Sequence, residues 1–156
     1  MKKILLPILA GVLLLSACGS GNTSGKLEVR DYWARGAVKG NNGAAYMMIN
    51  NGLAQDEELI GVSSAVANAV EIHSSKVEND VMQMTPQKSV LLPAGEDVEF
   101  KPGGLHIMFV GLEQDLNVGD EITLTLHFKN HEDITLTVPV KDTADMGGSG
   151  MDGHMP

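Results

Sequence analysis

Two histidines and two methionines stand at a spacing that suggests a shared metal site. Ten residues separate His73 from Met84, twenty-one separate Met84 from His106, and one separates His106 from Met108. Thioether sulfur and imidazole nitrogen suit Cu(I), whereas Mg²⁺ and Ca²⁺ prefer oxygen ligands. The residue types and their spacing therefore predict a Cu(I) site made by these four side chains.

Each of the four residues also has an ordinary structural explanation. A methionine in a strand commonly fills space in a core, and a histidine beside apolar residues is commonly a hydrogen-bonded structural residue. The combination and spacing of all four favour a metal site over coincidence. Met82 competes with Met84 for the thioether position, because it lies two residues earlier on the same face of a predicted strand.

The cysteine inventory excludes several kinds of protein. Cys18 is the one cysteine of the chain. A disulfide framework and a CxxC redox pair both need two cysteines. Blue-copper electron-transfer sites need a cysteine beside two histidines, and Cys18 is predicted to carry lipid instead. A carrier is favoured over a copper oxidase or a thiol reductase, so we do not expect an enzyme.

The beginning of the chain has the features of an export signal. Lys2 and Lys3 precede an apolar run from Ile4 to Leu15. That run is too short to span a bilayer comfortably but suits the core of a signal peptide. Leu15-Ser16-Ala17-Cys18 resembles a bacterial lipobox. We therefore expect residues 1–17 to be removed and Cys18 to become the lipid-modified first residue of an extracytoplasmic protein, anchored in the periplasm or at the outer face of the cell membrane.

Composition divides the remainder of the chain into three segments. Residues 18–25 are rich in Gly and Ser, as in a flexible tether, and residues 26–141 form the expected single folded domain. Residues 142–156 form a Gly-rich tail whose soft-metal ligands are additional copper-binding candidates: Met146, Met151, His154 and Met155. A solvated end without a copper role explains the tail equally well. The net charge of −9 excludes nucleic acid as a partner, and leaves the lipid as the expected contact with a membrane.

The folded segment reads as a series of short strands. Segments rich in β-branched and apolar residues alternate with Gly, Pro, Asn and Asp, and none has sustained helical periodicity. The predicted strands are Leu27–Trp33, Ala44–Ile49, Glu58–Val62, Ala69–His73, Val81–Met84, Ser89–Leu92, Asp97–Phe100, His106–Val110, Glu121–Phe128 and Asp133–Val140. An all-β antiparallel sandwich or barrel is therefore expected.

This architecture would place the four ligands in two pairs. His106 and Met108 are two residues apart on one strand, so they share a face. A loop centred between Glu78 and Asn79 would put His73 directly opposite Met84. A loop centred one position later would shift that pairing.

Several motifs together resemble the periplasmic copper chaperone family known as PCuAC. They are the four spaced ligands, Tyr32-Trp33-Ala34-Arg35, Asn42-Gly43-Ala44-Ala45-Tyr46-Met47 and Pro102-Gly103-Gly104-Leu105-His106-Ile107-Met108. The resemblance runs from about Leu27 to Val140. It implies a cupredoxin-like Greek-key β-sandwich that binds one Cu(I) through His73, Met84, His106 and Met108. It also implies copper supply to the dinuclear copper centre of cytochrome c oxidase.

The expected partners are the copper subunit of that oxidase and Sco-type copper proteins, and the chain is expected to be a monomer. Two alternatives stay open. One is a periplasmic copper-scavenging or resistance protein. The other is a metal-free β-sandwich interaction module, which predicts no rise in thermal stability when Cu(I) is added.

Overall fold

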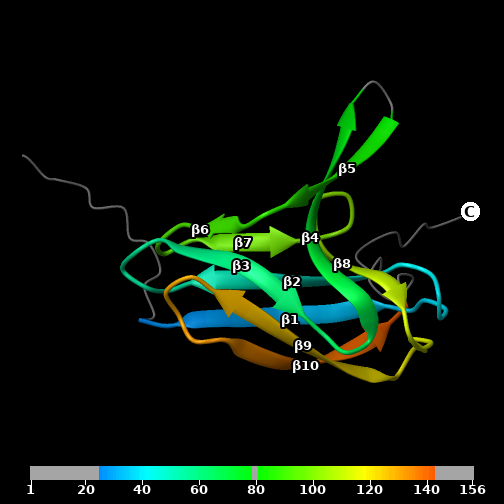
Figure 1. Ribbon diagram of the computed structural model, residues 1–156. Coiled ribbons are helices and arrows are strands. Elements are labelled where there is room, and N and C mark those ends of the chain that lie inside the picture. Colours follow the sequence, from blue (N-terminus) through cyan, green and yellow to red (C-terminus); the bar gives the residue numbers. More distant parts are fainter. Residues whose placement is uncertain (1–24, 79–80, 143–156) are drawn as a thin grey trace, which may run out of the picture.

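A computed structural model describes residues 25–78 and 81–142 of the chain, and these residues form an all-β domain (Figure 1). Signal peptide, Cys18, most of the tether and nearly all of the tail lie outside the described residues, so those predictions stay predictions. The strands are β1 (Leu27–Arg35), β2 (Gly43–Asn51), β3 (Glu57–Ser63), β4 (Ala67–Glu78), β5 (Val81–Gln87), β6 (Val90–Leu92), β7 (Asp97–Phe100), β8 (Leu105–Leu112), β9 (Glu121–Phe128) and β10 (Ile134–Lys141). In this part of the chain no helix is long and apolar enough to cross a membrane.

The β9–β10 hairpin forms as its sequence predicts. Ile122, Leu124 and Leu126 alternate with polar residues along β9, and all three are buried while the residues between them are exposed or half-buried. Leu124 pairs with Leu136 across the hairpin. The period of two in the sequence thus creates one buried face and one wetter face.

Strand order explains how two layers enclose one core. The neighbours run β5-β4-β8-β7-β2-β1-β10-β9-β3-β6, with an additional β2–β8 pairing. β1 and β10 are parallel and join through two residue pairs, whereas most neighbours are antiparallel. β3 and β6 also contact β4 and β2 of the other layer. Non-consecutive neighbours of this kind require the crossovers of a Greek-key sandwich, as expected.

The two faces of β2 and β8 have different roles. Met47 and Phe109 are fully buried in the core, together with other large apolar side chains from both layers. Successive residues in a strand point to opposite faces, so Tyr46 and Met108 lie on the other face of the same strands. The core packing on the inner face of β2 and β8 therefore fixes the position of these strands, which carry polar and sulfur-bearing side chains on their outer face.

A β-bulge in β1 changes which residues reach that outer face. Val29 pairs with Ile49 before the bulge and Trp33 pairs with Tyr46 after it, so one extra residue enters β1 between them. Asp31 lies in the bulge at φ 52°, a left-handed conformation that Asp tolerates better than most residues. The bulge puts Trp33 on the outer face, where its ring centre lies 4.6 Å from that of Tyr46.

Candidate metal centre

The two histidines of the predicted site lie side by side on neighbouring strands. His73 of β4 pairs directly with His106 of β8, and their ring centres are 5.8 Å apart. With metal–nitrogen bonds of about 2.0 Å, two imidazoles on one ion have ring centres at most about 6.4 Å apart. The observed separation therefore lets both rings bind the same ion.

Hydrogen bonds determine which nitrogen of each ring is left for a metal. Nδ1 of His106 donates to the carbonyl oxygen of Gly104 at 3.0 Å, which leaves Nε2 with its lone pair. Nε2 of His73 donates to the Glu71 carboxylate at 2.7 Å. Nδ1 of His73 is the one buried side-chain nitrogen or oxygen without a hydrogen-bond partner among the described residues. A histidine that donates to a carboxylate through one nitrogen and presents the other is a common metal-ligand arrangement.

The two predicted methionine ligands share the face of the histidines. Met108 lies two residues after His106 on β8. Met84 of β5 pairs with Ser75, which lies two residues after His73 on β4. All four predicted ligands thus belong to one face of three adjacent strands, β5, β4 and β8.

The predicted pairing of His73 with Met84 is wrong. His73 pairs with Pro86, because Glu78 pairs with Val81 and the centre of the turn falls one position later than expected. Met84 is therefore a diagonal neighbour of His73 rather than its direct partner. Diagonal neighbours on a sheet are still within reach of long side chains, so the shift leaves a shared site possible.

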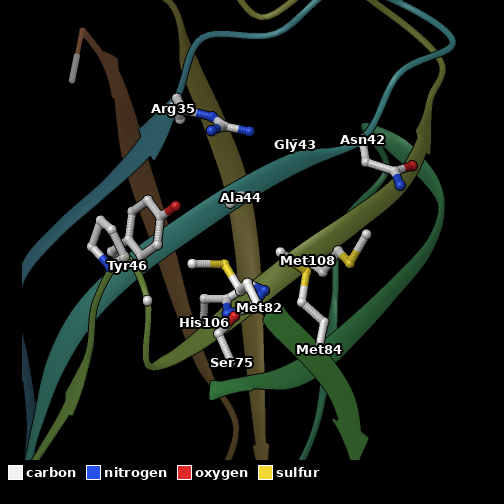
Figure 2. A pocket seen from close by; sticks show the side chains of 12 residues that line it. Arg35, Asn42, Gly43, Ala44, Tyr46, Ser75, Met82, Met84, His106 and Met108 are labelled. Atoms are coloured by element: carbon white, nitrogen blue, oxygen red, sulfur yellow. The ribbon is translucent and has the colours of Figure 1, made fainter. Parts of the chain in front are cut away.

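A cavity of about 460 Å³ opens on this face (Figure 2). Its lining residues are Arg35, Asn42, Gly43, Ala44, Tyr46, Ser75, Met82, Met84, Pro102, Gly103, His106 and Met108. His73 does not line it, but lies buried beside His106. An ion bound by both rings would therefore lie where His106 lines the cavity, next to the buried His73.

Both candidate thioethers of β5 line the cavity. Met82 is 55% exposed and Met84 is 53% exposed, and the two residues share a face of the hairpin that projects from the domain in Figure 1. Along the ladder, the Ser75–Met84 pair is two residue pairs from the pair that contains His73, and the Val77–Met82 pair is four pairs away. The register favours Met84 as the nearer ligand, and the choice stays a prediction.

Two features of the candidate centre were not predicted from the sequence: the Glu71 carboxylate that accepts from His73, and the Arg35 and Tyr46 side chains that line the cavity. Glu71 precedes His73 by two residues in a strand, a spacing that signals a shared face. Arg35 and Tyr46 line the wall opposite the methionines, and no pattern in the sequence reveals this because the β1 bulge decides it. Burial raises the pKa of Tyr46, an effect that the Arg35 charge partly opposes, so the hydroxyl stays protonated at neutral pH.

The donor set distinguishes this cavity from sites for hard cations. Within residues 25–78 and 81–142, no group of three or more His, Cys, Asp or Glu side chains is arranged to hold a metal ion. The candidate centre instead combines two imidazoles with thioethers, the ligands that prefer monovalent copper. The fold and this centre define a small β-sandwich domain with a soft-donor cavity on one outer face.

The chain belongs to the LpqE-like family, whose model, described as "Putative lipoprotein LpqE-like", matches residues 27–140. A curated relative, "Putative lipoprotein Lxx21020" of Leifsonia xyli subsp. xyli, is 32% identical over 144 residues, which cover 85% of this chain and 86% of the relative.

Solved structures confirm the resemblance to PCuAC domains. The copper-bound PCuAC domain from PmoF2 aligns with a TM-score of 0.64 and 26% identity, over 76% of this chain and 94% of that domain. The Cu(I) form of DR1885 from Deinococcus radiodurans aligns with a TM-score of 0.57 and 23% identity, over 80% of this chain and 86% of that chain. The second likeness supports the fold alone.

Proposed function

We propose that this protein is an extracytoplasmic Cu(I) chaperone that binds one copper ion through His73, Met84, His106 and Met108. One observation carries the proposal: paired histidines each use one ring nitrogen in a hydrogen bond and keep the other free, and His73 Nδ1 is buried without a partner. A buried polar atom without a partner is costly, and a metal bond would satisfy it. The copper-bound relative from PmoF2 supports copper as the cargo.

The ligand chemistry suits a protein that receives and releases copper. Neutral imidazole and thioether leave the +1 charge of Cu(I) uncompensated, which disfavours the higher charge of Cu(II). Thioethers do not titrate, so only the histidines compete with protons for the metal. An acceptor that carries thiolates can remove copper from such neutral ligands, because thiolate is the stronger soft donor.

The proposed location rests on the N-terminal sequence, and the proposed acceptors rest on the resemblance to the PCuAC family. Cys18 would anchor the domain in a membrane through lipid, and the residues before the domain would serve as a tether; the lipoprotein description of the Leifsonia relative supports an anchored, extracytoplasmic protein. The proposed acceptors are the dinuclear copper subunit of cytochrome c oxidase and Sco-type copper proteins. The protein would act as a carrier and not as an enzyme.

Titration with Cu(I) under reducing conditions, against a competing chelator, tests the binding site. We expect one tightly bound Cu(I) per chain and a higher melting temperature of the loaded protein, since a ligand that binds only the folded state stabilises it. No copper uptake and no change in melting temperature would instead support a metal-free interaction module.

A transfer experiment tests the chaperone role separately. The Cu(I)-loaded protein would be mixed with the apo copper domain of the oxidase subunit or with an apo Sco-type protein, and copper would be followed after separation of the two proteins. Rapid transfer to either acceptor supports delivery. Retention of copper in the presence of both acceptors would support scavenging or storage.

A further inference from the structure

The cavity is much larger than a copper ion requires. Its volume of about 460 Å³ lies in the range of pockets that hold small organic ligands, about 300–1,000 Å³. The methionines and His106 occupy one side of it, and Figure 2 shows Arg35 and Tyr46 on the other, with the tyrosine hydroxyl directed towards the guanidinium. There is room for copper together with part of a second molecule.

The wall opposite the methionines presents hydrogen-bond donors. The β1 bulge puts Arg35 on the outer face, where its guanidinium lines the cavity and its charge acts on the Tyr46 hydroxyl. Tyr46 stays protonated at neutral pH and offers a hydroxyl donor. The side-chain oxygen of Asn42 accepts a hydrogen bond from the Gly111 backbone N–H at 3.1 Å, which leaves the Asn42 NH₂ group as a donor at the cavity.

Charge complementarity specifies what this wall would bind. Cu(I) held by neutral ligands keeps its charge of +1, and the Arg35 guanidinium adds a second positive charge to the same cavity. The Glu71 carboxylate keeps its negative charge while it accepts from His73, but it does not line the cavity, and no other Asp or Glu of the described residues does so. An anion therefore fits between the metal and Arg35. A planar carboxylate matches the fork of guanidinium donors best.

We propose that the molecule that exchanges copper with this protein is a thiol that also bears a carboxylate, and that it binds in the cavity. Its carboxylate binds Arg35 and Tyr46, and its sulfur binds copper. This inference rests on the proposed Cu(I) function. In the exchange step the thiol loses its proton to solvent, its sulfur forms a bond to Cu(I), and the bond from one methionine sulfur to copper breaks. Copper remains monovalent throughout, so no oxidant or reductant is needed.

The test compares two small thiols that differ in one charge. Cu(I)-loaded full-length protein is mixed with 3-mercaptopropionate or with the neutral 3-mercaptopropionamide, at equal thiolate concentration, and the rate of copper loss is measured against a chromogenic chelator. We expect the carboxylate thiol to be effective at about tenfold lower concentration, the lower end for a hydrogen bond to a charged group. Equal effectiveness of the two thiols would overturn the proposal.

Matched variants separate a specific anchor from general electrostatic attraction. Arg35→Gln should remove the preference for the carboxylate thiol, and Tyr46→Phe should reduce it. Arg30→Gln changes the net charge equally, but Arg30 pairs with Asp97 and does not line the cavity, so the preference should persist. If Arg30→Gln also lost the preference for the carboxylate thiol, the proposal that Arg35 binds the carboxylate would be overturned.

Copper stoichiometry, measured on every variant before exchange, distinguishes the two proposals. Absence of bound Cu(I) in the native protein would refute the copper site itself, whereas normal copper binding without thiol preference would refute only the anchor.

Two acetylated, amidated dipeptides, Cys-Asp and Cys-Asn, identify the source of the thiol. A preference for Cys-Asp equal to or greater than that for 3-mercaptopropionate indicates a polypeptide acceptor, and a preference confined to 3-mercaptopropionate indicates a small free thiol.

Discussion

The histidine of β9 and the histidine pair of β4 and β8 form similar hydrogen bonds but leave different chemistry available. His127 contacts Ser63 Oγ through Nε2 at 2.8 Å and Asp133 through Nδ1 at 2.8 Å, so both of its ring nitrogens are occupied. His73 also contacts a carboxylate, yet its second nitrogen has no partner. The unoccupied nitrogen, rather than the presence of a neighbouring carboxylate, distinguishes the candidate ligand His73 from His127.

The surroundings of the two regions differ in the same sense. The His127 side chain is 36% exposed, and it lies on a polar sheet surface where Thr125 contacts Thr135. The His73–His106 pair is buried, and His106 lines a cavity together with Met82, Met84 and Met108. A metal bond would satisfy the buried Nδ1 of His73, whereas both ring nitrogens of His127 already have partners.

Removing one histidine from each region should give the largest difference in Cu(I) affinity between two variants. His106→Ala should weaken Cu(I) binding by more than about 100-fold, because loss of a ligand exceeds the upper effect of an outer-shell change. His127→Ala should leave the affinity unchanged. Competition with a Cu(I) chelator under reducing conditions measures both. Equal losses in the two variants would show that the free nitrogen is the wrong criterion.

The β5 methionines provide the next test, since both are exposed and line the cavity. Met84→Ala should weaken Cu(I) binding by at least about tenfold. Loss of a group that only contacts a metal ligand already costs about that much, and loss of a ligand should cost no less. Met82→Ala should have little effect. Neither change should alter the stability of the apo protein by more than about 0.5 kcal/mol. A larger loss in Met82→Ala would make Met82 the ligand.

Removing the carboxylate that contacts each histidine compares the two hydrogen bonds, Glu71 with His73 and Asp133 with His127. Glu71→Ala removes the acceptor that holds the proton on Nε2 of His73 and leaves Nδ1 free, so Cu(I) affinity should fall by about tenfold. Asp133→Ala should not change it. Nitrogen-15 NMR of the apo protein should report the loss of a single His73 tautomer in Glu71→Ala. An unchanged tautomer together with reduced affinity would point to loss of charge rather than of orientation.

Acid stability should depend on a carboxylate outside both regions, and this effect is the smallest. A hydrogen bond from Asn50, assisted by Arg30, lowers the pKa of Asp97. Its stabilising effect is therefore complete above the ordinary carboxyl pKa near 4 and is lost as the pH falls through the lower native value. Asp97→Asn should narrow the difference in melting temperature between pH 7 and pH 3, while copper affinity at pH 7 stays the same. An unchanged difference in Asp97→Asn would assign the acid sensitivity to other carboxylates.

The regular parts of the domain could be predicted because local pattern and tertiary burial agree. β9 occupies the predicted range Glu121–Phe128, and its alternating residues pack as expected. The hairpin of β4 and β5 agrees less well, since β4 extends beyond the predicted His73 to Glu78. Residues 76–78 and 81–86 of this hairpin are exposed, so burial does not determine the register, and the predicted partner of His73 was wrong by two residues.

The sequence by itself determined the residue types of the centre: two imidazoles and the thioethers near them, at a spacing compatible with one soft ion. Only the tertiary structure decided three other features. It selected the free nitrogen of each histidine through Glu71 and Gly104, it moved Met84 to a diagonal position, and it turned Arg35 into the cavity through the bulge at Asp31. These features depend on hydrogen bonds and strand registers between segments far apart in the chain, which no local pattern encodes.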